Sequence, residues 1–192
     1  MSTFDPFSTN ADRSTPINTP TPIHGQIVLV EYDPVWPEMY EAEAAHVRAA
    51  LGEKAIVLEH IGSTSVPGLI AKPCIDMLLG VTDSADEDAY VPALEQHGFV
   101  LRLRHPEWNE HRAFKSERIN VNLHVWSADS PEVARHINFR DWLRTHDDDR
   151  QLYAETKRVL AAQDFETMSD YANAKDDVVR QIQARIDAAA VR

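Results

Sequence analysis

The sequence predicts an α/β (α+β) domain in which a mixed β-sheet is flanked by helices and followed by a helical C-terminal part. Two observations predict this fold class. Short apolar runs alternate with helical patterns up to about residue 126, and only helical patterns follow from about residue 130. The chain has 192 residues, of which 43% are hydrophobic, so one domain can bury a core without disulfides.

Residues 1–25 differ in composition from the rest of the chain. Eight Ser/Thr and four Pro occupy twelve of these positions, and no periodic apolar face is present. Such a segment cannot bury enough surface to offset the entropy lost on ordering. We therefore predict a disordered tail over residues 1–25 and a folded domain over residues 26–190.

The elements follow from apolar periodicity and from the residues that interrupt it. The run 27–30 predicts a strand, and Asp33-Pro34 predicts the N-cap and first turn of a helix that Gly52 ends. Later strands are predicted at 55–61, 74–81, 99–104, 112–116 and 119–126. Helices are predicted at 86–97, 130–144, 152–160 and 171–186.

Charge and composition exclude several classes of function. The formal net charge of −12 argues against binding to nucleic acid, because an acidic surface repels phosphate backbones. The single cysteine, Cys74, excludes a disulfide framework and a cysteine-rich zinc site. Neither a transmembrane run nor a secretory signal is recognisable, so we expect a cytoplasmic protein without membrane contact.

A strand that runs into Gly62-Ser63-Thr64-Ser65 is the most informative feature. Small residues let a phosphate approach the backbone, and N–H groups and hydroxyls can donate to its oxygens. Asp76 follows inside an apolar strand, where a carboxylate is costly unless it is paired or bound to a metal. The alternative is a polar turn followed by a hydrogen-bonded Asp. The P-loop pattern is absent, and Lys72 follows too late to serve as its lysine.

The strand 119–126 alternates between apolar and polar residues. Asn122 and His124 therefore share a face that can meet Asp76 if the two strands are neighbours. An imidazole at that point suits a metal ligand or a proton carrier, although a structural role is the alternative. His105 and His111 flank a segment that we expect to be a solvated loop near this cleft.

Basic residues on the predicted helices are further candidates for contact with an anion. Arg140 and Arg144 lie four residues apart on one helix face, where they can bind phosphate or pair with neighbouring carboxylates. Lys157 and Lys175 are expected at the surface unless their helices close the pocket. The acidic run 147–149 is expected to be a solvated turn and helix start.

Several motifs together resemble the GrpB family, whose domains have a nucleotidyltransferase-like fold and also occur fused to dephospho-coenzyme A kinases. The resemblance covers about residues 26–187. The matching pieces are Tyr32-Asp33-Pro34-Val35-Trp36-Pro37, the long block from Glu59-His60-Ile61-Gly62-Ser63 to Gly68, Ala71-Lys72-Pro73, Ile75-Asp76, Leu123-His124-Val125, Phe139-Arg140-Asp141-Trp142-Leu143-Arg144, and Tyr171 with Lys175.

The resemblance implies a catalytic core of the nucleotidyltransferase type. Enzymes of that superfamily place a Gly-Ser turn on nucleotide phosphates and a pair of carboxylates on divalent metal. Gly62-Ser63 matches the turn and Asp76 matches the first carboxylate. Leu78 stands where the second carboxylate is expected, and His124 or Asn122 occupies the strand where a third is usual. One carboxylate and one imidazole make a poorer Mg²⁺ site than two or three carboxylates.

Three functional hypotheses follow. The first is an enzyme that uses a nucleoside triphosphate and a divalent cation (Mg²⁺ or Mn²⁺) on a small molecule or cofactor precursor. In it, Asp76 and His124 are catalytic and bind the metal, while the phosphates contact Gly62, Ser63, Thr64, Ser65, Lys72, Arg140 and Arg144. The second is a non-catalytic module that binds a nucleotide or cofactor. The third is a zinc site formed by His60, His124 and either His105 or His111.

Overall fold

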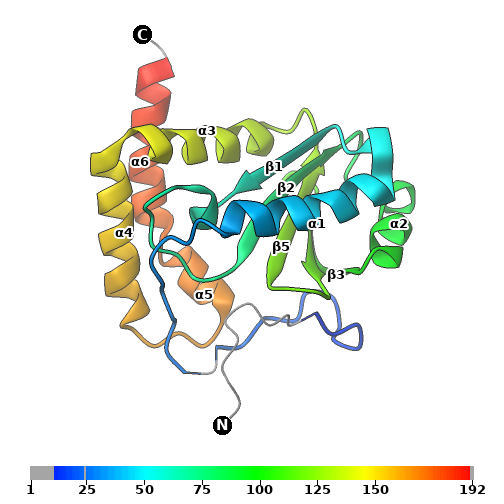
Figure 1. The fold of residues 1–192 in the computed structure, drawn as a ribbon, viewed down its shortest axis with the longest axis horizontal. Coiled ribbons are helices and arrows are strands. Elements are labelled where there is room, and N and C mark those ends of the chain that lie inside the picture. The colour runs from blue at the N-terminus through cyan, green and yellow to red at the C-terminus, as the bar shows by residue number, and fades with distance from the viewer. Residues whose placement is uncertain (1–10, 24, 191–192) are drawn as a thin grey trace.

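The computed structural model describes residues 11–23 and 25–190. Its centre is a five-stranded sheet of order β1-β2-β5-β4-β3. The central pair β2 (Ile75–Val81) and β5 (Val121–Ser127) is parallel, and the other neighbours are antiparallel. The remaining strands are β1 (Val57–Ile61), β3 (Phe99–His105) and β4 (His111–Ser116). The predicted mixed sheet with flanking helices is confirmed (Figure 1).

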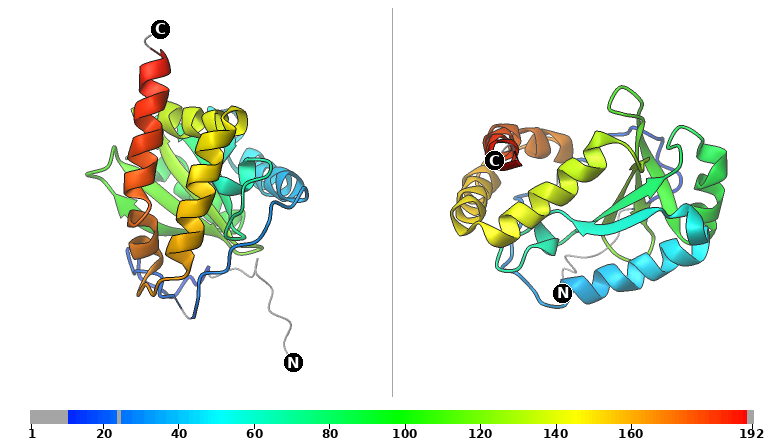
Figure 2. Two further views of the ribbon diagram at one scale, coloured as in Figure 1. Left: turned by 90° about the vertical axis from the view of Figure 1, so that its left-hand side faces the viewer. Right: turned by 90° about the horizontal axis from the view of Figure 1, so that it is seen from above.

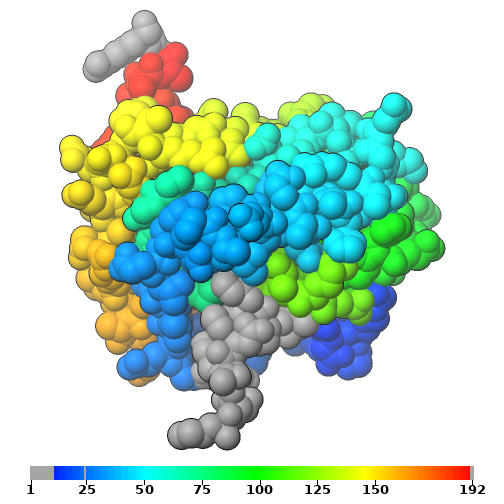
Figure 3. Space-filling view, in the orientation of Figure 1, coloured from blue at the N-terminus to red at the C-terminus, as the bar shows by residue number. Residues whose placement is uncertain are grey.

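One face of the sheet is covered by α1 (Trp36–Leu51) and α2 (Val91–Gln96). The apolar positions of α1 repeat at helical spacing, so Trp36, Tyr40 and Val47 all enter the main core. Figure 3 shows α1 lying across the front of the molecule. This packing explains why the alternating residues Val121, Leu123 and Val125 of β5 are completely buried.

The other face is covered only in part, by α3 (Pro131–Thr145). Val133 of α3 packs there with Leu78 and Trp126. Next to this contact, α3 joins α4 (Asp147–Ala161) and α6 (Asp176–Ala190) in a second core beside the sheet. The views in Figure 2 show these helices grouped at one end of the sheet, away from α2. The uncovered part of the face is therefore bordered by helices.

Several predicted element boundaries are corrected. The run 27–30 is not a strand, because only Val30 makes an isolated bridge, to Ala71. The first helix begins at Trp36, and the Asp33 side chain accepts from the Val35 N–H at 2.9 Å in the turn before it. The helix predicted over 86–97 divides into a 3₁₀ turn, Glu87–Ala89, and α2.

The C-terminal part also differs in detail from the prediction. A separate short helix, α5 (Met168–Asn173), precedes α6 where one continuous helix was predicted. Thr167 caps α5 in a reciprocal capping box with Asp170. The predicted solvation of the 147–149 run is wrong for Asp149, which is buried, accepts from the Trp142 indole at 2.7 Å and pairs with Arg185.

Residues 11–23 of the Ser/Thr/Pro-rich segment make defined contacts, which its composition does not indicate. Arg13 pairs with Glu117 at 2.6 Å, and the Asn18 N–H donates to the Arg102 carbonyl at 2.9 Å. Farther along, Pro22 forms a bridge with Thr167 beside α5. The segment thus runs along the lower side of the molecule in Figure 1 and borders the cavity described below. Residues 1–10 and 24 lie outside the described part.

Candidate functional site

The Gly-Ser turn leaves the end of β1 and enters a 3₁₀ turn over Ser63–Ser65. Gly62 has φ of 69°, a conformation that glycine tolerates best, and a methyl group at this position would overlap the Asp76 carboxylate. The Ser65 hydroxyl donates back to the Gly62 carbonyl at 2.6 Å. The Thr64 hydroxyl donates to the Cys74 carbonyl at 3.3 Å. Of the three predicted hydroxyls, only that of Ser63 contacts a cationic side chain.

Asp76 lies beside this turn because its strand pairs with β1, where Ile61 is opposite Asp76. The parallel register with β5 places Asn122 opposite Asp76, and the Asn122 amide donates to Asp76 Oδ1 at 2.6 Å. His124 Nε2 lies 4.0 Å from the same oxygen. The structure therefore brings Asn122 and His124 to Asp76, as the strand alternation predicted, and places Gly62 and Ser63 beside them.

A second imidazole supports His124. His111 Nε2 lies 3.0 Å from His124 Nδ1, and the two rings stack at 5.2 Å between centroids. Burial lowers the pKa of His124 to about 4 and that of His111 to about 2. Both imidazoles are therefore neutral at pH 7. The predicted solvation of His111 is wrong, because this residue begins β4 and is 1% exposed.

The histidine zinc site is contradicted by the geometry. His60 lies one residue along β1 from Glu59 and so points to the opposite face, where it stacks on Tyr40 at 4.8 Å. Over residues 11–23 and 25–190, no group of three or more His, Cys, Asp or Glu side chains lies close enough to hold a metal ion. Leu78 is buried in an apolar contact. Asp76 and His124 alone are too few ligands for a divalent cation, so phosphate oxygens of a bound ligand would have to complete its coordination.

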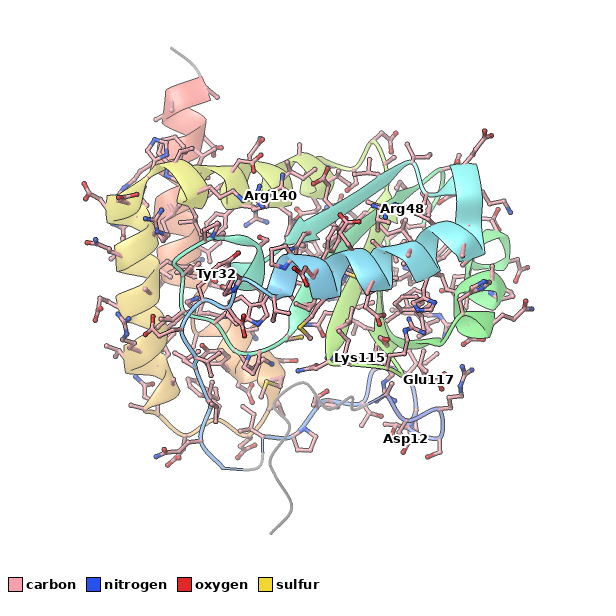
Figure 4. All side chains as sticks on the ribbon, in the orientation of Figure 1. Asp12, Tyr32, Arg48, Lys115, Glu117 and Arg140 are labelled. Carbon is pink, nitrogen blue, oxygen red and sulfur yellow. The ribbon has the colours of Figure 1, made fainter. Side chains whose placement is uncertain are left out.

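The two arginines of α3 contact protein acceptors. Arg140, which Figure 4 labels on this helix, donates to Glu59 Oε2 at 2.7 Å, to the His60 carbonyl at 2.9 Å and to Asp141 at 2.8 Å. Arg144 donates to the Ser65 carbonyl at 2.8 and 3.0 Å. Both guanidinium groups thus fix the end of β1 and the Gly-Ser turn, and only Arg140 lines the cavity.

Four lysines line the cavity beside the Gly-Ser turn. Lys72 was predicted to contact phosphate, Lys157 and Lys175 were expected at the surface unless their helices close the pocket, and Lys115 was not predicted. Lys157 is 2% exposed, and its Nζ donates to Ser63 Oγ at 3.0 Å and to the Ile70 carbonyl. Lys115, labelled near the lower end of the sheet in Figure 4, shares a face with Asn122 because the two are paired across β4 and β5. Lys175 lies over the Tyr171 ring at 4.6 Å. The lysines come from separate elements, so only the folded chain brings them to one cavity.

These residues line one cavity of about 1030 Å³. Eight basic side chains and two carboxylates line it among the described residues: Lys72, Arg102, Lys115, Arg135, Arg140, Lys157, Lys175 and Arg180, with Asp76 and Asp176. Within the same part of the chain, none of the four lysines has a carboxylate within ion-pair distance. Burial lowers the pKa of Lys115, Lys157 and Lys175.

Relatives of the chain share both its sequence and its fold. The UPF0157 protein BH1888 of Halalkalibacterium halodurans is 51% identical over 167 residues, which are 87% of this chain and 86% of that protein. A protein of Mycolicibacterium paratuberculosis named dephospho-CoA kinase is 29% identical over 68% of this chain and 38% of its own length.

The structural comparison agrees with the sequence comparison. The crystal structure of conserved protein GrpB from Enterococcus faecalis aligns with a TM-score of 0.73 at 28% identity, and covers 86% of this chain and 100% of that one. The family model described as GrpB protein matches residues 26–185. The chain therefore belongs to the GrpB family.

Proposed function

We propose that this protein binds a phosphorylated small molecule of nucleotide size in the cavity beside the Gly-Ser turn. The observation that carries the proposal is a group of four lysines that line the same cavity as Ser63 and have no carboxylate in ion-pair range among the described residues, in a chain of net charge −12: Lys157, which is buried, and Lys72, Lys115 and Lys175, which are half-buried. A buried cation without a counter-ion is costly. An anionic ligand would offset this cost in the complex.

The size and wall of the cavity suit such a ligand. Its volume of about 1030 Å³ accommodates a nucleotide or a cofactor precursor. Beside the cations, its wall includes the rings of Phe139, Tyr153 and Tyr171. Lys157 and Lys175 lie over the two tyrosine rings, so the rings help to hold these lysines at the cavity wall. The lysines would then select for phosphate.

Calorimetric titration with pyrophosphate, ATP, GTP, CTP and UTP, in EDTA, tests the proposal. We expect at least one of them to bind, and Lys115→Met to weaken that binding at least tenfold, the scale of a lost charge-assisted hydrogen bond. The matched control is Lys54→Met. Lys54 does not line the cavity and donates to the Ala89 carbonyl at 3.1 Å, so affinity should not change. Absence of binding by all five compounds would overturn the proposal.

A second candidate is nucleotidyl transfer from a nucleoside triphosphate to a small molecule or cofactor precursor, with Mg²⁺ or Mn²⁺. The position of Asp76, in contact range of Gly62 and next to His124, favours it. A relative named dephospho-CoA kinase points to a cofactor precursor as one acceptor class. Repeating the titrations with each cation tests this candidate. It requires metal to strengthen triphosphate binding and Asp76→Asn to remove that effect, and equal affinity in EDTA would count against it.

A further inference from the structure

Ser63 and Lys157 form a hydrogen-bonded pair that can do more than bind phosphate. They lie 94 positions apart in sequence, and Lys157 Nζ is 3.0 Å from Ser63 Oγ. Lys157 projects from α4, is 2% exposed and also donates to the Ile70 carbonyl. Its Nζ lies 4.8 Å from the centre of the Tyr153 ring. The amine is therefore held in place on several sides and directed at one hydroxyl.

The surroundings of Lys157 favour its neutral form. Burial and the nearby cations Lys175 and Arg158 lower its pKa to about 7, against the opposing effect of Asp76. The other polar groups around the amine are Ser63 Oγ, the Ile70 carbonyl and Tyr153, which Ser63 also contacts through a hydrogen bond. A large share of the amine is thus unprotonated at neutral pH. It can accept a proton from the hydroxyl that it touches.

Ser63 occupies the position in the turn that suits a nucleophile. Gly62, with φ of 69°, turns the chain so that Ser63 opens the 3₁₀ turn at the cavity wall. Its neighbours Thr64 and Ser65 are 1% and 3% exposed, and their hydroxyls donate to backbone carbonyls. Thr64 also lines the cavity and its hydroxyl lies 3.0 Å from His60 Nε2, but Thr64 is buried, so among these three residues Ser63 combines the greatest exposure with a lysine partner. Nucleophile and base within hydrogen-bond reach are the signature of covalent catalysis.

We propose that Ser63 is a nucleophile, that Lys157 is its general base, and that the electrophile is a phosphorus atom of the ligand in the cavity. The Ser63 Oγ–P bond forms while the bond from phosphorus to the bridging oxygen breaks, and the leaving group keeps that electron pair. The hydroxyl proton passes to Lys157 Nζ, and phosphorylated or nucleotidylated Ser63 results. This proposal rests on the proposed function for its substrate class, a phosphoanhydride or an activated phosphoester.

A fluorophosphonate probe tests the pair without knowledge of the natural ligand. The full-length protein is incubated with it in EDTA, and the adduct is followed by intact mass and located by peptide mapping. We expect one adduct on Ser63 and none in Ser63→Ala. The matched control is Ser14→Ala. It removes an exposed serine that does not line the cavity and whose hydroxyl donates to Asp12, and it should label at the wild-type rate.

The variant Lys157→Arg distinguishes a base from a cation at this position, because arginine stays positively charged but cannot accept a proton near neutral pH. We expect labelling to slow at least tenfold. Since this buried variant can fail to fold, the wild-type pH profile provides the second measurement. The rate should rise about tenfold per unit below pH 7 and level off above it, as the amine loses its proton.

Labelling outside Ser63, no labelling, or a rate independent of pH between 5 and 9 would overturn the proposal. These outcomes differ from failure of the proposed function. If titration shows nucleotide binding but Ser63 is not labelled, the cavity binds without a nucleophile. If Ser63 is labelled but none of the phosphates binds, the nucleophile is present and its substrate class is not a phosphate.

Discussion

The arginines of α3 and the lysines of the cavity carry the same charge in different surroundings. Arg140 is 8% exposed and has two carboxylates and a carbonyl as partners. Lys175 and Lys115 lie at the cavity with no carboxylate in ion-pair range among the described residues. Paired buried charges hold a fold together, whereas unpaired ones destabilise it until a ligand arrives. Arg140 is therefore a structural cation, whereas Lys115 and Lys175 are available to an anionic ligand.

The largest expected effect is the loss of the paired cation. Arg140→Met leaves Glu59, Asp141 and the His60 carbonyl without their donor, and should lower the free energy of unfolding by about 2 kcal/mol, because the guanidinium is buried while the two carboxylates are partly solvated. Urea unfolding monitored by circular dichroism measures it. An unchanged urea midpoint together with a weaker affinity for ATP would show that Arg140 binds the ligand and is not a structural cation.

The buried histidines extend this comparison, because acid adds a charge to groups that burial keeps neutral. Burial lowers the pKa of His60 to about 4 and of His111 to about 2 in the folded protein, from an unfolded value of 6.5. Between pH 6.5 and about 4 the unfolded chain therefore binds more protons, and stability falls as pH falls. Each of these histidines should contribute about 1.3 kcal/mol to the loss of stability between pH 7 and 5.5. The loss in a His60→Gln variant should be smaller by that amount, and an unchanged loss would show that His60 does not contribute to it.

Removal of an unpaired cation should have the opposite effect on stability. Lys175→Met deletes a charge whose pKa burial already lowers, so the free energy of unfolding should stay level or rise by about 1 kcal/mol. Affinity for the anion that binds best should fall about tenfold. Thermal melting and calorimetric titration measure the two quantities. A clear loss of stability would show that Lys175 has a structural partner in the folded state.

The smallest effect is expected for an exposed pair far from both regions. Arg48 donates to Glu41 at 3.0 Å on α1, and their side chains are 52% and 61% exposed. Arg48→Ala should change the free energy of unfolding by less than about 0.5 kcal/mol and leave anion affinity unchanged. This variant calibrates the Arg140 result, since it also removes a guanidinium. A loss of stability as large as that of Arg140→Met would show that burial of the guanidinium does not explain the difference between the two arginines.

The sequence alone supplied the local features of the candidate site. Alternation along residues 119–126 placed Asn122 and His124 on one face, since successive side chains of a strand point to opposite sides. The Gly62-Ser63 turn was recognisable because small residues and hydroxyls interrupt an apolar pattern. The family resemblance, which rests on the same motifs, is confirmed by the family model over residues 26–185.

The features that the sequence did not predict depend on contacts between residues that are far apart in the chain. A helix lysine such as Lys157 has the sequence pattern of a solvated residue until a second helix and a turn 94 positions away enclose it. Arg140 was equally compatible with a phosphate or a carboxylate, and only the approach of α3 to the end of β1 supplied Glu59 as its partner. Residues 11–23 have a disordered composition, and their contacts come from Glu117, Arg102 and Thr167.

The sequence by itself therefore determined the fold class, most of the helices and strands, the Gly-Ser turn and the position of Asp76 within a strand. Each of these follows from periodicity and local backbone chemistry. Only the tertiary structure decided which cations are paired and which line the cavity. The physical reason is that burial and partner distance set the energy of a charge, and both depend on elements far apart in the chain.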